Sequence, residues 1–315
     1  MKIYGWFRYW VVAAWVFHVG WVAAQAPCPP DLSTPTQAQV DAGAKAAKNR
    51  GYLWRISKEG RASYLYGSIH VAQFDWIFPG KEVYQALQAT DVLALEINPL
   101  DENTLRELQQ GMAADTHHAL PKAVQARINR LASKNCVPSA LLQPMRAEMQ
   151  IATLAEMVAR QQGLEPTYGI DLQLALLARA IGKPVEPLET VAIQLAALLE
   201  PDPVKRLRDT QDALTQLESG RDRASLMKVA AAWANSDFQT LSTYEAWCQC
   251  INTEAEKQAA RRLLEERNPH MAKNLDALHS QGKKVFATVG ALHMIGPRGL
   301  PALMAERGYV VQRVF

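Results

Sequence analysis

The sequence predicts an α/β fold whose sheet is assembled from the two ends of the chain. Runs rich in β-branched and aromatic residues gather near each end, while residues 105–268 show helical patterning. Both terminal regions also follow one plan, in which a β-rich run ends in Gly-x-x-His and is followed by a short loop, a helix and a second β-rich run. We therefore expect a sheet built from N- and C-terminal β–Gly-x-x-His–α–β units, with a large helical insert between them.

The first unit begins with an expected hairpin. The runs LWRIS and ASYLY flank KEGR, which predicts a turn at Gly60. The chain then reaches Gly67 and His70 of the first motif. Pro79 is typical of a first helical turn, so we expect a helix over residues 79–89. The apolar run DVLALEI, residues 91–97, predicts a buried strand.

The insert is divided by glycines and prolines into segments of helical length. One expected helix begins at Pro121, and the others cover residues 145–162, 171–181, 190–199, 204–219, 223–235, 238–248 and 253–267. The segment KPVEPLE, residues 183–189, is expected to be a short strand or an extended link.

The second unit repeats the plan of the first. A helix over residues 269–281 is expected to precede a strand over residues 284–289. The second motif, with Gly290 and His293, follows this strand. A helix over residues 301–307 and the run YVVQRVF then complete the unit.

The first 24 residues are typical of a secretory signal peptide. Lys2 and Arg8 give it a positive start, and the apolar run that follows over residues 10–24 is shorter than the ~20 residues that a membrane helix needs. The small residues before Gln25 form a cleavage site. We therefore expect a periplasmic or secreted chain with no stable membrane span after cleavage; the alternative is an uncleaved anchor.

The remaining chain is expected to form one domain over residues 51–315, after a loosely ordered lead-in over residues 25–50. No Gly/Ser-rich linker divides it. The formal net charge of the chain is +3, and loss of Lys2 and Arg8 with the leader lowers it to +1. Such a balance gives no basis for binding nucleic acid.

The four cysteines are Cys28, Cys136, Cys248 and Cys250. An even number in an exported protein favours disulfides. Because Cys248 and Cys250 are separated by one residue, each is expected to bond to Cys28 or Cys136 rather than to the other. The alternative is a Cys-x-Cys metal site or redox motif.

The chemistry of the chain is expected to reside in His70, His293 and Glu96. A residue just past the end of a strand lies at the edge of a sheet, where open α/β folds place their ligands. Glu96 ends the strand that follows the first motif. Two histidines and a carboxylate suffice to hold a divalent metal with positions left open for water. Gly67 and Gly290 allow a tight backbone or the close approach of a ligand.

Each of these three residues also has a structural interpretation. Either histidine could be a hydrogen-bonded imidazole of the core or of a loop. Glu96 could be a surface or capping carboxylate, although the run VLALE is apolar for an exposed strand.

Other polar residues are weaker candidates. Asp171 begins an expected helix and could be a cap. Glu189 precedes another helix and could be a cap or a catalytic group. Arg267 and Asn268 end a charged segment that could be solvated. The remaining histidines of the chain body are expected at the surface: His117, His118, His270 and His279.

Several common catalytic motifs are absent. The chain contains no H-E-x-x-H, no G-x-S-x-G and no G-x-x-x-x-G-K-[ST]. This argues against common zincins, α/β-hydrolases and P-loop enzymes.

Five segments, taken in order, resemble the TraB/GumN family, a group that includes the Tiki-type proteases and a bacterial pheromone-shutdown protein. They extend from about Tyr52 to Phe315 and read YLYGSIHVA, DVLALEINP, YGIDLQLALLARAIGKPVEPLET, RNPHMAKNL and VFATVGALHMIGPRGLPALMAERGYVV. The ordered set is more specific than any one segment. Ser68 stands where many members have threonine.

The resemblance implies a metal-dependent peptidase. Tiki-type members use Mn²⁺ or Co²⁺, and their paired Gly-x-x-His motifs and glutamate correspond to His70, His293 and Glu96. A divalent Mn, Co or Zn ion is therefore the expected cofactor. The resemblance also implies a fold like that of the erythromycin-esterase (EreA-like) and haem-binding ChaN-like proteins.

The resemblance further implies roles for residues outside the metal set. Arg267 is expected to be catalytic, stabilising an oxyanion or a substrate carboxylate, while Asp171, Glu189 and Asn268 are expected to bind substrate. Glu96 is expected either to bind the metal or to take the proton of the attacking water.

The leading hypothesis from the sequence is thus a periplasmic metal-dependent hydrolase that cleaves peptide bonds. One alternative is a non-catalytic periplasmic protein that binds or sequesters a peptide or small ligand. A haem or metal carrier is a further alternative.

Overall fold

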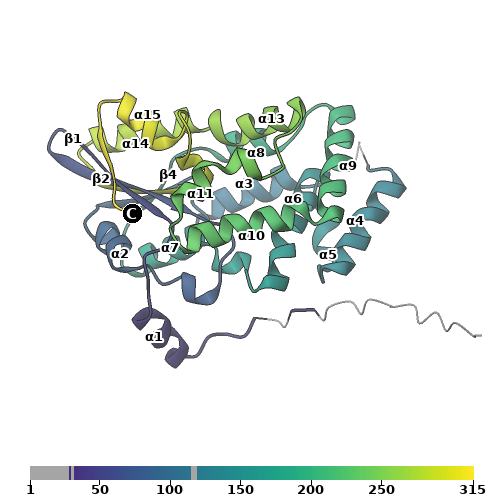
Figure 1. Cartoon of the computed structure of the whole chain (residues 1–315), viewed down its shortest axis with the longest axis horizontal. Helices are drawn as coiled ribbons and strands as arrows, with labels where there is room; N and C mark the ends of the chain where they lie inside the picture. Colours follow the sequence, from purple (N-terminus) through teal and green to yellow (C-terminus); the bar gives the residue numbers. More distant parts are fainter. Residues whose placement is uncertain (1–27, 30–31, 115–118) are drawn as a thin grey trace, which may run out of the picture.

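The computed structural model describes residues 28–29, 32–114 and 119–315 (Figure 1). The expected signal peptide over residues 1–24 lies outside these ranges, as do His117 and His118. In the described part of the chain, no helix is both long and apolar enough to cross a membrane.

The described residues form a mixed α/β fold around one six-stranded sheet, which confirms the predicted fold class. The strand order is β4-β3-β5-β2-β1-β6. Only β1 runs against its neighbours, while the other five strands share one direction. The strands are β1 (Tyr52–Lys58), β2 (Arg61–Ser68), β3 (Val92–Leu95), β4 (Val185–Pro187), β5 (Val285–Gly290) and β6 (Val310–Arg313). Both ends of the chain therefore contribute to one sheet, and β4 comes from the expected link within the insert.

The predicted hairpin is confirmed. Lys58 pairs with Arg61, so the turn contains only Glu59 and Gly60. Both turn residues have a left-handed φ, of 53° and 75° respectively, as a two-residue hairpin turn that matches the twist of the strands requires. The hairpin fixes β2, the strand that carries the first Gly-x-x-His motif.

The helical insert is also observed, with some elements shorter than predicted. The expected helix over residues 238–248 is interrupted near Thr243, and the helix expected over 253–267 changes to a π-turn at Arg261–Glu265. The helices of the insert are α3 (Glu102–Met112), α4 (Lys122–Lys134), α5 (Ser139–Leu142), α6 (Ala147–Met157), α7 (Ile170–Ala180), α8 (Val191–Leu198), α9 (Pro203–Ser219), α10 (Arg221–Ala234), α11 (Phe238–Ser242), α12 (Tyr244–Trp247) and α13 (Glu254–Ala260). The terminal units contribute α2 (Lys81–Gln88), α14 (Asn268–Ser280) and α15 (Leu300–Glu306).

The lead-in is more ordered than predicted. It forms helix α1 (Gln37–Lys45), which begins with a capping box between Thr36 and Gln39. No residue of α1 is buried. The helix lies at the margin of the main body in Figure 1, where Gly43 packs against the ring of Phe78. The expectation of a loosely ordered lead-in placed no helix here; local capping suffices to start one without an apolar face.

The hydrophobic core has two parts. The larger part surrounds the sheet and includes Leu65, Leu93 and Phe286. The smaller part lies within the insert, around Ile128 and Leu154. The insert thus has its own packing in addition to its contacts with the sheet, and α10 lies across the junction (Figure 1).

Trp233 of α10 connects the insert to the first motif. Its side chain is 1% exposed, and its Nε1–H donates to the carbonyl oxygen of Gly67 at 2.8 Å. The backbone carbonyl of Trp233 in turn accepts from the N–H of Gly51 at 2.8 Å. These bonds fix α10 against β2, the strand that ends two residues before His70.

Replacing Trp233 with phenylalanine should lower the free energy of unfolding by ~1–3 kcal/mol, because the buried Gly67 carbonyl loses its partner. The matched control is Trp247→Phe, at a half-buried tryptophan whose Nε1–H donates to Thr240 O at 2.9 Å. Urea unfolding of both variants tests the expectation. Equal losses of unfolding free energy in the two variants would show that the bond from Trp233 to Gly67 stabilises the fold no more than the bond from Trp247 does.

The structure contains two disulfides, as expected, and one of them links the lead-in to the body. Their pairing, however, is Cys28–Cys136 and Cys248–Cys250. The expectation that Cys248 and Cys250 would not pair was wrong. Gln249 between them adopts a left-handed φ of 54°, which turns the chain back and brings the two Cα atoms to 5.1 Å, within the range of ordinary disulfides.

Candidate active site

Both Gly-x-x-His motifs end at the same edge of the sheet. β2 and β5 are adjacent, with Ser68 opposite Gly290, and Glu96 follows β3 on the other side of β5. A methyl group built on Gly290 would lie 3.5 Å from Glu96 Oε1, 3.6 Å from His293 Cδ2 and 3.8 Å from His70 Nε2. The three residues expected to form the site therefore surround one point, next to the backbone of Gly290.

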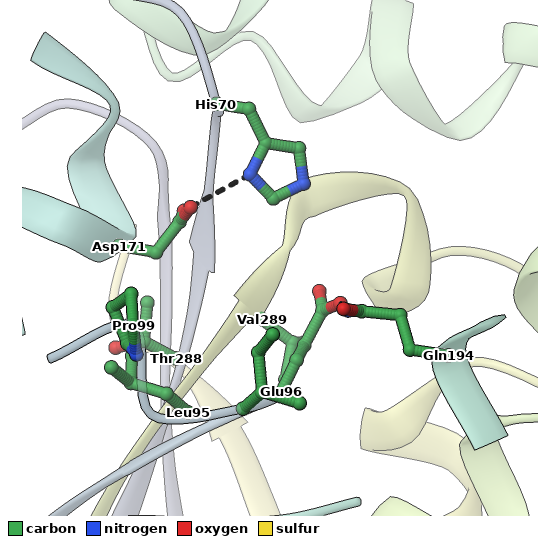
Figure 2. Close-up of a pocket in the computed structure, with 9 residues that line it drawn as sticks. His70, Leu95, Glu96, Pro99, Asp171, Gln194, Thr288 and Val289 are labelled. Atoms are coloured by element: carbon green, nitrogen blue, oxygen red, sulfur yellow. Dashed lines mark hydrogen bonds and ion pairs between the residues drawn. The ribbon is translucent and has the colours of Figure 1, made fainter. Parts of the chain in front are cut away.

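His70 is oriented by Asp171, which lies in the first turn of α7. Its Nδ1 contacts Asp171 Oδ2 at 2.7 Å (Figure 2). The nearby Asp171 carboxylate raises the pKa of His70 to about 10, although desolvation opposes this shift. Gly169, not Asp171, occupies the N-cap of α7, so the capping interpretation of Asp171 is wrong. Asp171 instead holds the imidazole with Nε2 left for another partner.

His293 lies in a short turn after β5 and is 3% exposed. Its Nδ1 contacts Asn268 Oδ1 at 2.6 Å, while Asn268 Nδ2 donates to the carbonyl of Arg298 at 2.8 Å. Since the amide nitrogen is engaged with a carbonyl, the amide oxygen is the acceptor and His293 Nδ1 carries the hydrogen. Burial lowers the pKa of His293 to about 4. His293 is therefore neutral near pH 7, with a lone pair on Nε2.

Arg267 joins two buried carboxylates. Its Nη2 donates to Glu96 Oε2 at 2.5 Å, and its Nε donates to Glu189 Oε2 at 3.0 Å; a second bond joins Nη2 to Glu189 Oε1. Nη1 donates to Leu263 O at 3.0 Å and lies 3.3 Å from His293 Nε2. The guanidinium thus has a partner for each of its five N–H groups.

Glu96 remains ionised despite its burial. Burial acts to raise its pKa, but His293, Arg267 and His70 together outweigh that effect and lower the pKa to about 2. The N–H of Gly290 also donates to Glu96 Oε1 at 2.8 Å. Burial raises the pKa of Glu189, the second carboxylate on Arg267.

The structural alternatives for these charged residues do not hold. Glu96 is 8% exposed and Glu189 3%, while Arg267 and Asn268 are 7% and 2% exposed. These four side chains are therefore buried in the interior and do not lie at the surface or at a solvated helix end. Thr190, not Glu189, caps α8.

Gln194 also belongs to the site, although the sequence analysis missed it. Its Nε2 donates to Glu96 Oε2 at 3.2 Å and to Glu189 Oε1 at 3.4 Å. Figure 2 shows its amide beside the Glu96 carboxylate. The available signal was a single polar residue within the apolar helix VAIQLAAL.

The remaining described histidines lie outside the site. His270 is exposed, as predicted. His279 is 1% exposed, and its ring nitrogens contact Ser63 Oγ at 3.1 Å and Lys58 O at 3.2 Å. The surface prediction for His279 was therefore wrong, because Ser63 and the end of β1 provide polar partners inside the fold.

A cleft of about 760 Å³ opens above the converging residues. His70, His293, Glu96, Asp171 and Arg267 line its polar part. Its walls are largely apolar and include Met149, Leu172, Leu198, Leu226, Val229, Leu263 and Leu264. A smaller pocket of about 200 Å³, lined by His70, Glu96, Asp171, Gln194 and Thr288, adjoins it (Figure 2). The site is thus accessible to a ligand of peptide size with apolar side chains.

The donor set fits a divalent metal in its chemistry. Each histidine directs Nδ1 at an oxygen partner, the arrangement typical of metal-bound imidazoles. Because the pKa of His70 is raised to about 10, a metal would have to displace the proton from His70 Nε2. As placed, however, His293 Nε2 lies 3.8 Å from Glu96 Oε1, and Arg267 contacts both. Accordingly, no group of three or more His, Cys, Asp or Glu side chains in the described ranges is already arranged to hold a metal ion.

Comparison with known proteins places the chain in a family. The model of the TraB/PrgY/gumN family matches residues 52–313. The chain belongs to this family. It is 28% identical over 284 residues to proteins of Shigella flexneri and of Escherichia coli (strain K12), each named "Uncharacterized protein YbaP". Each match covers 82% of this chain and 95% of the relative. No solved structure matches. Both Gly-x-x-His motifs, with Glu96 and Arg267, fall within the region shared with the TraB/PrgY/gumN family.

Proposed function

We propose that the protein is a periplasmic or secreted metal-dependent hydrolase that cleaves peptide bonds. The observation that carries this proposal is the convergence of His70, His293 and Glu96 around Gly290, in an otherwise largely apolar cleft. The two disulfides are compatible with export, since such bonds persist in oxidising compartments. We further propose that the fold is of the EreA-like and ChaN-like kind.

His70, His293 and Glu96 would hold the ion. A Mn, Co or Zn ion bound there would lower the pKa of a coordinated water and polarise the scissile carbonyl. Asp171 and Asn268 would keep the two imidazoles in their orientation through Nδ1.

Glu96 is better suited to bind metal than to act as the general base. An effective base has a pKa near the working pH, whereas the pKa of Glu96 is lowered to about 2. A carboxylate with so low a pKa stays ionised at neutral pH and can bind a metal ion there without first losing a proton. We therefore assign the ligand role to Glu96.

Arg267 would act by holding Glu96 rather than by contacting substrate. Each of its donors already has a partner, so an oxyanion contact would require it to release one. Glu189 and Asn268 are likewise buried and engaged. Asp171 lines the cleft, so of the residues expected to bind substrate it is the one in reach of a ligand.

The proposal is tested with wild-type protein purified without a histidine tag. It should hydrolyse members of a broad peptide library, lose this activity on chelation and regain it with Mn²⁺, Co²⁺ or Zn²⁺. Failure to cleave any peptide with any of these ions would contradict it.

Exchange of Glu96 for glutamine distinguishes the two roles of this residue. We expect the variant to lose both bound metal and turnover, because a neutral amide is a weak metal ligand. Metal content and hydrolysis are measured on the same preparation. Full metal occupancy with lost turnover would instead make Glu96 the general base.

The Gly290→Ala variant tests the point of convergence. The backbone of Gly290, with φ −51° and ψ 138°, accommodates alanine, and the added methyl meets its neighbours only at ordinary contact distances of 3.5–3.8 Å. We therefore expect a change of less than ~1 kcal/mol in the free energy of unfolding. Turnover should nevertheless fall by at least about 10-fold, since displacements of about 1 Å in a site can cost this much or more. Unchanged kinetics would show that nothing binds beside Gly290.

A non-catalytic binding protein is the second candidate. The contacts of Arg267 with Glu96 and His293 favour it, because a cation already neutralises the site. This alternative predicts ligand affinity that survives chelation, together with no hydrolysis under any metal condition.

A further inference from the structure

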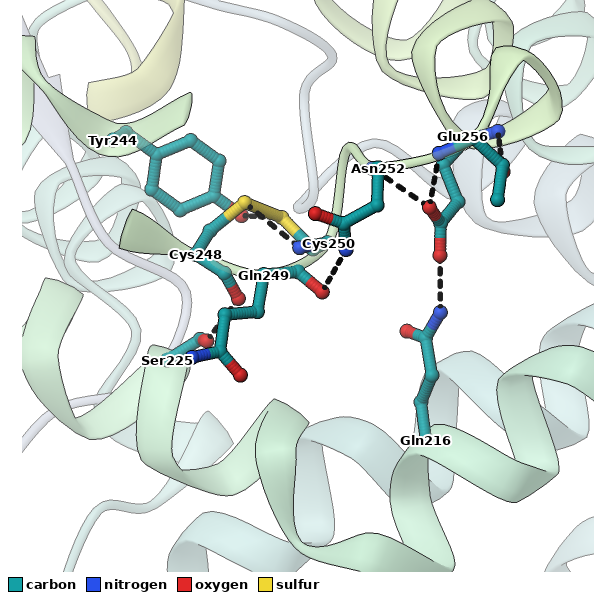
Figure 3. Close-up of a disulfide and its surroundings, with 9 residues drawn as sticks. Gln216, Ser225, Tyr244, Cys248, Gln249, Cys250, Asn252 and Glu256 are labelled. Carbon is teal, nitrogen blue, oxygen red and sulfur yellow. Dashed lines mark hydrogen bonds between the residues drawn. A yellow bond between two sulfur atoms is a disulfide. The ribbon is translucent and has the colours of Figure 1, made fainter. Parts of the chain in front are cut away.

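The Cys248–Cys250 disulfide lies on the wall of the cleft. Cys250, Tyr244 and Ser225 line the same cleft as His70 and His293. The disulfide lies in the segment between α12 and α13. Figure 3 shows it beside Tyr244 and Ser225. A disulfide at this place is accessible to a reagent that enters the cleft.

This disulfide contributes little as a structural crosslink. In the chain-entropy model, the restraint that a disulfide places on the unfolded chain grows with the length of the loop it closes. Cys28–Cys136 spans a sequence separation of 108, whereas Cys248–Cys250 spans 2. The small ring also holds Gln249, a residue with a Cβ, at a left-handed φ of 54°, a conformation that non-glycine residues rarely adopt. Opening the ring would release that strain.

The two sulfur atoms differ in accessibility and in their donors. Cys248 is 2% exposed, while Cys250 is half-buried and borders the cleft. The hydroxyl of Tyr244 donates to Cys250 Sγ at 3.2 Å, and the N–H of Cys250 donates to Cys248 Sγ at 3.1 Å. Because hydrogen-bond donors stabilise a thiolate, Cys248 is a competent leaving group when an incoming thiolate attacks Cys250.

We propose that Cys248–Cys250 is a redox-active disulfide that exchanges with a dithiol reductant through the cleft, whereas Cys28–Cys136 is structural. A thiolate of the reductant attacks Cys250 Sγ and forms a mixed disulfide, while the bond to Cys248 breaks and Cys248 leaves as a thiolate. The second thiol of the reductant then attacks its own bonded sulfur and releases Cys250. The protein gains two electrons and two protons, which the dithiol loses.

Exchange at this disulfide changes the wall of the cleft. The carbonyl of Cys248 accepts from Ser225 Oγ of α10 at 2.8 Å, so the oxidised ring anchors this segment to the insert. Opening the ring frees the connection between Tyr244 and α13, which leads on to Arg267. Hydrogen exchange should therefore rise over residues 244–253 on reduction and stay unchanged in β5.

The test uses the full native protein in buffers of graded reduced and oxidised dithiothreitol. Free thiols are alkylated and assigned by peptide mapping. Cys248 and Cys250 should become half-reduced at a dithiol ratio at least tenfold lower than Cys28 and Cys136, which corresponds to a potential difference of about 30 mV or more. Tyr244→Phe removes only the hydroxyl that donates to Cys250 Sγ, the sulfur released as a thiolate in the second step. It should therefore slow the exchange severalfold, with Cys28–Cys136 as the internal control.

Two results would overturn the proposal. Both disulfides could open at the same dithiol ratio, or Cys248–Cys250 could open only after the protein is unfolded in urea. Either result would make this ring a structural crosslink like the other. An unchanged rate in Tyr244→Phe would overturn the role given to the Tyr244 hydroxyl.

Discussion

Replacing His70 with alanine should abolish peptide hydrolysis and metal binding while the protein remains folded. The His70 side chain is 58% exposed, and its ion pair is with Asp171; exposed pairs of this kind contribute only ~0–1 kcal/mol to stability. Its Nε2, however, is one of three donors at the convergence point. Because loss of a group that merely supports a metal ligand already costs 10–100-fold, loss of the ligand itself should reduce turnover by at least about 100-fold.

The matched control for this variant is His270→Ala. His270 is exposed and lies close in sequence to Arg267, but it does not line the cleft. It should keep both metal and turnover. His293→Ala should lose activity as completely as His70→Ala, with an additional stability loss of ~1–3 kcal/mol because Asn268 loses its buried partner. A His70→Ala protein with wild-type turnover would contradict the proposed mechanism.

Arg267→Ala should be the most destabilising single change in the site, lowering the free energy of unfolding by ~3–5 kcal/mol. Its removal leaves Glu96 and Glu189 buried side by side without the cation that joins them. Burying two carboxylates without a neighbouring cation destabilises the folded state, because the charges lose their hydration and repel each other. Chemical unfolding at neutral pH measures the loss.

Arg262→Ala is the control for the Arg267 variant. Arg262 also pairs with a carboxylate, since its Nη1 lies 3.2 Å from Glu200 Oε2, but its side chain is 29% exposed. We expect a loss of only about 1 kcal/mol, because this pair is partly solvated and Arg262 joins one carboxylate rather than two. Adding Glu96→Gln and Glu189→Gln to Arg267→Ala should recover part of the lost stability, because the repelling charges are then absent. Equal losses in the two arginine variants would show that the buried network does not stabilise the fold.

The local patterns of the sequence predicted the parts of the fold that short segments determine. The turn at KEGR and the apolar run VLALE led to the hairpin and to β3, and the paired motifs placed His70 and His293 at one sheet edge. Helix α1 was missed although its signal, Thr36 with Gln39, was present. Its lack of buried residues removed the apolar periodicity on which the helix prediction depended.

The charged network could not be predicted from local patterns. Arg267 and Glu189 are 78 residues apart, and Arg267 and Glu96 are 171 apart. Nothing in a charged segment such as EERN shows that its arginine is buried. Likewise, the pairing of Cys248 with Cys250 depends on the left-handed backbone conformation of Gln249. Glutamine rarely adopts this conformation, so the sequence gives no sign of it.

The most direct test of the metal-centre proposal is the divalent metal content of protein purified from periplasm without a histidine tag. Wild-type protein and His270→Ala should each contain close to one Mn, Co or Zn ion per chain after loading and dialysis, and His70→Ala should contain none. Equal metal content in wild type and His70→Ala, or none in either, would contradict the proposal that His70, His293 and Glu96 form a metal centre.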